Sequence, residues 1–189
     1  MSINDQVSLM AFGGNLPSGS GSPVRTIEAA LSRLQDHGVV VLKVSRFYQT
    51  PCFPKNAGPD FVNGCAALSC ELPPRDLLGV LHRIEAEFGR ERRQRWAGRT
   101  LDLDLLAIGD KVLPDAETQS GWQNLSLEEQ MRVAPDQLIL PHPRLQDRGF
   151  VLVPLADVAP DWRHPILGKT VLEMRNALPK SELEGIVPL

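Results

Sequence analysis

Residues 90–108 read RERRQRWAGRTLDLDLLAI, and the second half of this stretch decides the fold. Polar and apolar residues alternate over residues 100–105 and apolar residues continue to 108, so residues 100–108 are predicted to form a β-strand. Side chains two positions apart on a strand share a face, with backbone positions about 6.5–7 Å apart. Asp102 and Asp104 therefore direct two carboxylates to one place, directly after five arginines. That combination suits a polyphosphate carried by divalent metal ions.

The composition is that of an ordinary globular protein, with 42% hydrophobic and 23% charged residues among 189. We expect a single domain over residues 1–189. The net charge of −3 gives no bulk attraction to nucleic acid. Three cysteines without a CxxC spacing indicate neither a disulfide framework nor a zinc site. With no secretory start and no apolar run of about 18 residues, the sequence predicts a cytoplasmic protein that does not bind membranes.

Upstream of residues 100–108 the pattern alternates between strands and helices. β-branched and apolar runs predict the strands, and each helix begins with a proline and stops at a glycine. The resulting order of strand, helix, strand, strand, helix, strand predicts an α+β, ferredoxin-like βαββαβ core, in which an antiparallel sheet carries both helices on one face. The expected elements are strands at residues 7–12, 39–50 and 61–72, and helices at residues 23–38 and 74–89.

The rest of the chain adds to this core. Residues 115–137 are polar, and within them Ser126 followed by Glu129 fits a capping box that opens a helix over residues 126–133. Residues 150–158 are amphipathic, and a tail interrupted by prolines follows. We expect C-terminal additions that pack on the core.

The two aspartates allow two interpretations. Mg²⁺ takes carboxylate, water and phosphate oxygens, so two carboxylates on one strand face could hold a pair of ions that bridge adjacent phosphates. Alternatively, Asp102 and Asp104 lie on the solvated face of an edge strand, because alternation with Leu101, Leu103 and Leu105 is typical of any half-buried strand.

The arginine-rich stretch allows three interpretations. Guanidinium groups bind phosphate through paired hydrogen bonds, whereas a solvated loop would pair them with neighbouring glutamates. Surface ion pairs contribute only about 0–1 kcal/mol, a weak reason to gather five arginines. A nucleic-acid module that stacks Trp96 on a base is the third interpretation, and the acidic balance of the chain argues against it.

Three further residues are ambiguous. His142 lies between two prolines, so it is either a fixed donor to phosphate or part of a rigid surface turn. Phe61 and Phe150 are either core residues or platforms for a flat ligand.

Six motifs together resemble one family, the 6-hydroxymethyl-7,8-dihydropterin pyrophosphokinases, in order from Val7 to about Pro160. RWAGRTLDLDLL is similar to the family signature around its paired metal-binding aspartates. The other motifs are FGGNL at the end of the first strand, SRFYQTP, DFVNGCAAL, LHRIEAEFGR and LPHPRLQDRGFVLVPL.

The resemblance implies transfer of the β,γ-diphosphate of ATP to the hydroxymethyl group of the dihydropterin, with release of AMP. It implies two Mg²⁺ ions on Asp102 and Asp104, ATP as co-substrate, and a monomer that acts on small molecules. By the same resemblance the catalytic residues are Arg90, Arg92, Arg99, Asp102 and Asp104. The nucleotide-side residues are Leu78, His82, Arg92, Arg95, Trp96, Arg99, Leu105, Leu140, His142, Pro143 and Arg148. The pterin-side residues are Thr50, Pro51, Phe53, Phe61, Asn63, Trp96 and Phe150.

These roles agree with the chemistry of the side chains. Two rings such as Phe61 and Phe150 can enclose a flat pterin, and the Asn63 amide can both donate to and accept from its edge. A different metal-dependent nucleotidyl enzyme with a similar Asp-x-Asp strand remains an alternative. That enzyme would not require Thr50-Pro51, Phe61-Val62-Asn63 and Phe150 together.

Overall fold

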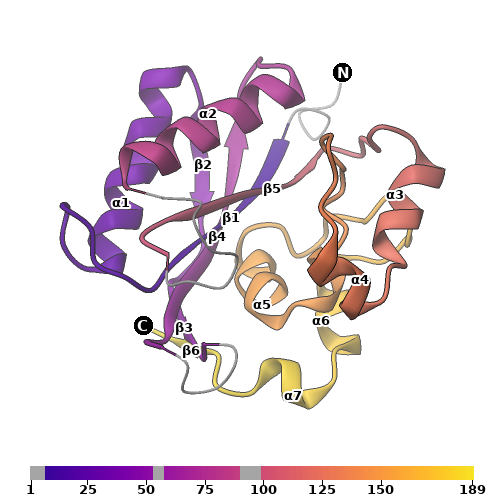
Figure 1. Ribbon diagram of the computed structural model, residues 1–189. Helices are drawn as coiled ribbons and strands as arrows, with labels where there is room; N and C mark the ends of the chain where they lie inside the picture. The colour runs from indigo at the N-terminus through magenta and orange to yellow at the C-terminus, as the bar shows by residue number, and fades with distance from the viewer. Residues whose placement is uncertain (1–6, 53–57, 90–98) are drawn as a thin grey trace.

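The computed structural model describes residues 7–52, 58–89 and 99–189, which form one antiparallel sheet between helices (Figure 1). The strand order is β5-β1-β4-β3-β6, and β2 also pairs with β4, beside β3. Every strand pairing in this part of the chain is antiparallel, as predicted. The strands are β1 (Val7–Gly14), β2 (Val40–Val44), β3 (Tyr48–Thr50), β4 (Phe61–Ser69), β5 (Asp102–Ile108) and β6 (Val187–Pro188).

One face of the sheet is covered by α1 (Pro23–Arg33) and α2 (Pro74–Glu87), which confirms the predicted ferredoxin-like layer. The Ser22 hydroxyl caps α1 by accepting from the Arg25 N–H, and a 3₁₀ turn, η2 (Leu34–His37), extends it to Gly38. The core on this face joins strand and helix side chains, including Met10, Phe12, Leu103, Ile27 and Leu81.

The opposite face is covered by the C-terminal additions. The helices α5 (Gly149–Val158) and α6 (Val171–Ala177) pack there over a second core that includes Leu9, Cys65, Ala107, Leu152 and Leu155 (Figure 1). The sheet is therefore buried on both faces. No helix in the described ranges combines the length and the apolar character needed to cross a bilayer.

Two predicted features differ in the structure. The strand expected at residues 39–50 is divided into β2 and β3, because the Ser45 hydroxyl accepts from the Cys65 N–H over 2.9 Å and donates to the Arg46 carbonyl. Side-chain bonds of this kind compete with the strand ladder. Residues 115–137 hold two helices rather than one, α3 (Ala116–Gln123) and α4 (Leu127–Arg132). The predicted capping box of Ser126 and Glu129 is confirmed. The remaining elements are η3 (Leu145–Asp147) and α7 (Lys180–Leu183).

Candidate active site

The alternation of β5 places its two aspartates together. Leu103 and Leu105 are buried against α1 and α2, so Asp102 and Asp104 point to the other face of the sheet. Asp104 pairs with Ala11, which packs in the core beneath α5. Both aspartates are half-buried. The face shared by the two carboxylates is therefore the face that α5 covers, and neither side chain lies free in solvent.

Gly13 of β1 joins the aspartates to the pterin-side residues. It pairs with Asp102 on one side and with Asn63 of β4 on the other. Directly paired residues share a face of the sheet. Asn63 and Asp102 lie two strands apart, so their backbones are separated by about 10 Å. A Cβ on Gly13 would overlap the Asn63 Oδ1. The missing side chain gives the Asn63 side chain room to lie over the backbone of Gly13.

Positive side chains surround the two aspartates. Arg99 forms an ion pair with Asp102 through its Nη1. Burial lowers the pKa of Arg148, while the charges of Asp104 and Asp102 oppose that shift. Arg148 therefore lies within the electrostatic field of both carboxylates. Two carboxylates, a group that suits metal ions, and two guanidinium groups, which suit phosphates, therefore lie at one place.

His142 is fixed to β5. Its backbone N–H donates to the Leu106 carbonyl over 2.8 Å. At this point a β-bulge interrupts the pairing of β5 with β1. Its Nδ1 accepts from the Arg144 N–H over 3.2 Å. Burial, followed by the charges of Arg148 and Arg144, lowers the pKa of His142 to about 3. The ring is therefore neutral at pH 7 and carries its proton on Nε2, where it can donate to a phosphate.

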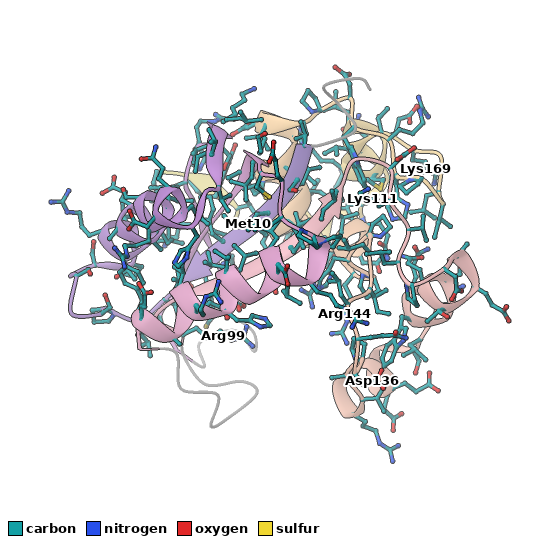
Figure 2. All side chains as sticks on the ribbon, turned by 90° about the horizontal axis from the view of Figure 1, so that it is seen from above. Met10, Arg99, Lys111, Asp136, Arg144 and Lys169 are labelled. Carbon is teal, nitrogen blue, oxygen red and sulfur yellow. The ribbon has the colours of Figure 1, made fainter. Side chains whose placement is uncertain are left out.

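The other nucleotide-side residues that the structure describes come from α2, β5 and the segment around His142. Leu78 and His82 are half-buried on α2, across the sheet from the aspartates. The side chains of Leu105 and Leu140 are buried in the core, so these two side chains are not accessible to a ligand. Pro143 is half-buried beside His142. Figure 2 shows Arg99 beside α2 and Arg144 farther along the same side, toward α3 and α4.

The pterin-side residues that the structure describes lie around the ends of β3, β4 and α5. The Asn63 Nδ2 donates to the buried Thr50 hydroxyl over 2.7 Å, and Thr50 pairs with Phe61. Phe61 is half-buried and Pro51 is exposed. Phe150 is 38% exposed at the start of α5, with the Arg148 guanidinium 5.4 Å from its ring centroid. Neither ring is fully buried, which favours the platform interpretation over the core interpretation.

Sequence reasoning missed Asn15, which is 6% exposed and connects the two sides. Its Oδ1 accepts from the Arg99 N–H over 2.8 Å, and its Nδ2 donates to the Pro59 carbonyl over 3.0 Å. The Arg99 carbonyl in turn accepts from the N–H groups of Asn15 and Leu16. The Gly-Gly-Asn turn that ends β1 was the available signal.

Five of the predicted site residues lie outside the part of the chain that the structure describes. They are Phe53, Arg90, Arg92, Arg95 and Trp96. The helix α3 does reach the nucleotide side, because the Nε2 of the fully buried Gln119 donates to the Pro141 carbonyl over 3.1 Å. Residues 115–137 are therefore hydrogen-bonded to the segment that carries His142.

Comparison with known proteins identifies close sequence relatives. The family model for 7,8-dihydro-6-hydroxymethylpterin-pyrophosphokinase matches residues 9–160. The 2-amino-4-hydroxy-6-hydroxymethyldihydropteridine pyrophosphokinase of Synechocystis sp. is 36% identical over 168 residues, covering 88% of this chain and 73% of the relative. The enzyme of the same name from Pseudomonas aeruginosa is 38% identical over 180 residues, covering 94% of both chains.

The fold also has solved counterparts. The HPPK-DHPS of Plasmodium falciparum, in complex with pteroate, superimposes with a TM-score of 0.63 at 14% identity, over 90% of this chain. The chain spans 44% of the length of that structure. At this identity the likeness concerns the fold.

Proposed function

This chain belongs to the 7,8-dihydro-6-hydroxymethylpterin-pyrophosphokinase family, and from that premise we propose that it transfers the β,γ-diphosphate of ATP to the hydroxymethyl group of 6-hydroxymethyl-7,8-dihydropterin, releasing AMP. This reaction serves folate biosynthesis. The observation that carries the proposal is the row of Asn63, Gly13 and Asp102. A pterin on Asn63 and a metal-bound nucleotide on Asp102 would meet over Gly13, which has no side chain to separate them.

Asp102 and Asp104 are the residues that would hold Mg²⁺, as two ions shared with ATP. Two carboxylates supply part of the octahedral set of oxygen ligands, and Mg²⁺ usually completes that set with phosphate oxygens and water. Bound Mg²⁺ neutralises phosphate charge and lowers the pKa of a coordinated hydroxyl. The half-buried position of both carboxylates on one face supports this assignment.

The described side chains act on the phosphates by position and charge. Transfer of this kind depends on in-line alignment and electrostatic stabilisation, and it needs no covalent nucleophile. Arg99 and Arg148 would stabilise the charge that develops on the transferred and leaving groups, and the Nε2 proton of His142 would donate to a phosphate oxygen. We assign Arg90, Arg92 and Arg95 to the same task, by the family resemblance alone.

The pterin would lie between the rings of Phe61 and Phe150. Each stacked ring contributes about 0.5–1.5 kcal/mol beyond the burial of its area. The Asn63 amide faces the same side of the sheet and supplies the polar contact that orients the flat ligand. Arg148 already covers part of Phe150, so one side chain borders both substrates.

We also propose a monomer that acts in the cytoplasm. Cys52, Cys65 and Cys70 are all free thiols, which fits a reducing compartment.

The test is incubation of the protein with ATP, Mg²⁺ and 6-hydroxymethyl-7,8-dihydropterin, with nucleotide products separated by chromatography. AMP formed in step with consumption of the pterin is the expected result, and ADP in its place would refute diphosphate transfer. Oligonucleotide binding that weakens steeply with salt, without AMP formation, would instead support a nucleic-acid module.

A further inference from the structure

After α6 the chain returns to the sheet and adds a strand beside the pterin-side residues. β6 pairs antiparallel with β3, so that Val187 lies opposite Gln49. The Leu189 N–H donates to the Phe47 carbonyl over 2.9 Å. The side chains of Val187 and Leu189 are more than half exposed. Backbone pairing rather than side-chain burial therefore holds this strand in place.

Just before β6, the backbone at Gly185 lies against Pro51. Gly185 has a φ of +75°, which residues with a side chain rarely adopt. A Cβ there would lie 2.6 Å from the Pro51 Cγ and 3.1 Å from its Cδ. Pro51 follows Thr50, whose hydroxyl accepts from the Asn63 amide. The C-terminal segment thus contacts the end of the strand that carries Thr50.

The same segment contacts the start of α5. The Glu182 carbonyl lies so close to Gly149 that a Cβ on Gly149 would overlap it. The Ile186 Cδ1 lies 3.0 Å from the same Cβ position. Gly149 immediately precedes Phe150, the ring proposed to stack on the pterin. Figure 1 shows this yellow segment running from α6 through α7 to β6, beside β3.

We propose that residues 182–189 are a positioning segment that fixes Pro51 and Phe150 relative to each other and thereby sets the affinity for the dihydropterin. This inference rests on the proposed function. The segment lies beyond residues 9–160, the part of the chain that the family model matches. β6 and β5 lie at opposite ends of the strand order, so the segment is remote from Asp102 and Asp104. Its contacts with Pro51 and with the start of α5 therefore predict a larger effect on the pterin than on ATP.

The first test compares two glycines with similar backbone conformations. Gly185→Ala adds a Cβ against Pro51, whereas Gly168→Ala adds one at a φ of +65° with no atom within 4 Å. Gly168→Ala thus controls for backbone strain alone. We expect Gly185→Ala to raise the KM for dihydropterin about fivefold or more, with kcat and the KM for ATP within about twofold of wild type. Gly168→Ala should leave kcat and the KM values for dihydropterin and ATP unchanged.

A double-mutant cycle separates positioning from a general loss of structure. Pro51→Ala removes the ring atoms that the new Cβ would meet, so Gly185→Ala should raise the KM for dihydropterin less in the Pro51→Ala background than in wild type. Deletion of residues 187–189 removes β6 while retaining Gly185, and it should show the same selective rise. The deletion decides the outcome if Gly185→Ala fails to fold.

The inference is overturned if the KM for dihydropterin stays within about twofold in both Gly185→Ala and the deletion. It is also overturned if the KM values for both substrates rise together. A wild-type protein that forms no AMP would refute the proposed function, and that result is visible before any variant is made. Wild-type turnover with an unaltered KM in the variants would refute this inference alone.

Discussion

Asn63 and Asp102 lie in one row of the sheet, on either side of Gly13. Their backbones are about 10 Å apart across β1, and both side chains point toward the layer that α5 forms. Asn63 is already held by Thr50, and Asp102 by Arg99. The two proposed substrate sites are therefore positioned by a single strand, β1, whose only contribution to this row is a glycine.

Gly13→Ala should damage pterin binding because its new methyl group would overlap the Asn63 Oδ1. Either the Asn63 side chain turns away from Thr50 or the strands separate. We expect at least about a tenfold fall in kcat/KM for dihydropterin and a loss of about 1–3 kcal/mol in the free energy of unfolding. Steady-state kinetics and urea unfolding measure the two effects. Gly121→Ala in α3 has no atom within 4 Å of its Cβ and should leave kcat/KM unchanged, with stability equal to or above wild type.

Asp102→Asn and Asp104→Asn keep the shape of each side chain and remove its charge. Each should lower kcat for AMP formation by about 10²–10³-fold, because the carboxylates no longer hold metal ions on the phosphates. Titration of pterin fluorescence without ATP should give wild-type affinity. Asp136→Asn, on an exposed loop, is the matched control and should retain full turnover. Wild-type turnover in either site variant with Mg²⁺ would exclude the metal assignment.

His164 should make folding sensitive to acid. Its side chain is fully buried, its Nδ1 accepts from the N–H groups of Ile166 and Leu167, and burial lowers its pKa to about 4. Since this folded-state pKa lies below the ordinary 6.5, the unfolded chain binds more protons between these values. The contribution of neutral His164 to the free energy of unfolding is fully present above pH 6.5 and is lost as the pH falls toward 4. At pH 5 this contribution has fallen by about 2 kcal/mol.

Urea unfolding at pH 7.5 and pH 5 measures this loss in wild type and in His164→Gln. The variant cannot take up the extra proton, so its free energy of unfolding should fall less between the two pH values. His142, with its pKa lowered to about 3, adds a loss of the same sign in both proteins. An equal pH dependence in the two proteins would show that His164 is not buried in its neutral form.

Gln119→Glu tests whether α3 supports the nucleotide side. The substitution replaces the Nε2 donor to the Pro141 carbonyl with an oxygen in a fully buried position. We expect a loss of about 1–3 kcal/mol at pH 7.5 and a higher KM for ATP, because Pro141 precedes His142. The loss should shrink at pH 5, where a protonated carboxyl donates again. Gln35→Glu, at an exposed position, should change neither the free energy of unfolding nor the KM for ATP.

Periodicity in the sequence predicted the elements that bury one clear face. Leu103 and Leu105 of β5 occupy the core beneath α1 and α2, and Asp102 and Asp104 lie on the opposite face, as the alternation over residues 100–105 required. The 3₁₀ turn η2, which continues α1, ends before Gly38, and α2 ends two residues before Gly89. The capping box at Ser126 was found for the same reason, because a cap is a local hydrogen-bond pattern of neighbouring residues.

The elements that escaped prediction lack such a pattern. α3 buries a polar residue, Gln119, on its inner side. β6 is held through backbone pairing and leaves Val187 exposed. The role of Asn15 depends on Arg99 and Pro59, which only the folded chain brings together. α6 differs from these elements, because Thr170 and Glu173 form a capping box. This local pattern is recognisable in the sequence and could have predicted the start of the helix.

The alternation within β5 also restricts how the chain can change its length over evolution. Removing or adding one residue within β5 would turn every later side chain of the strand to the opposite face. Carboxylates would then enter the apolar core, and leucines would line the place where phosphates are proposed to bind. The helices α3 and α4 follow β5 and stand outside the sheet, so residues can be gained or lost there without inverting any strand. Natural length variation among related chains should therefore concentrate in that region and leave β5 intact.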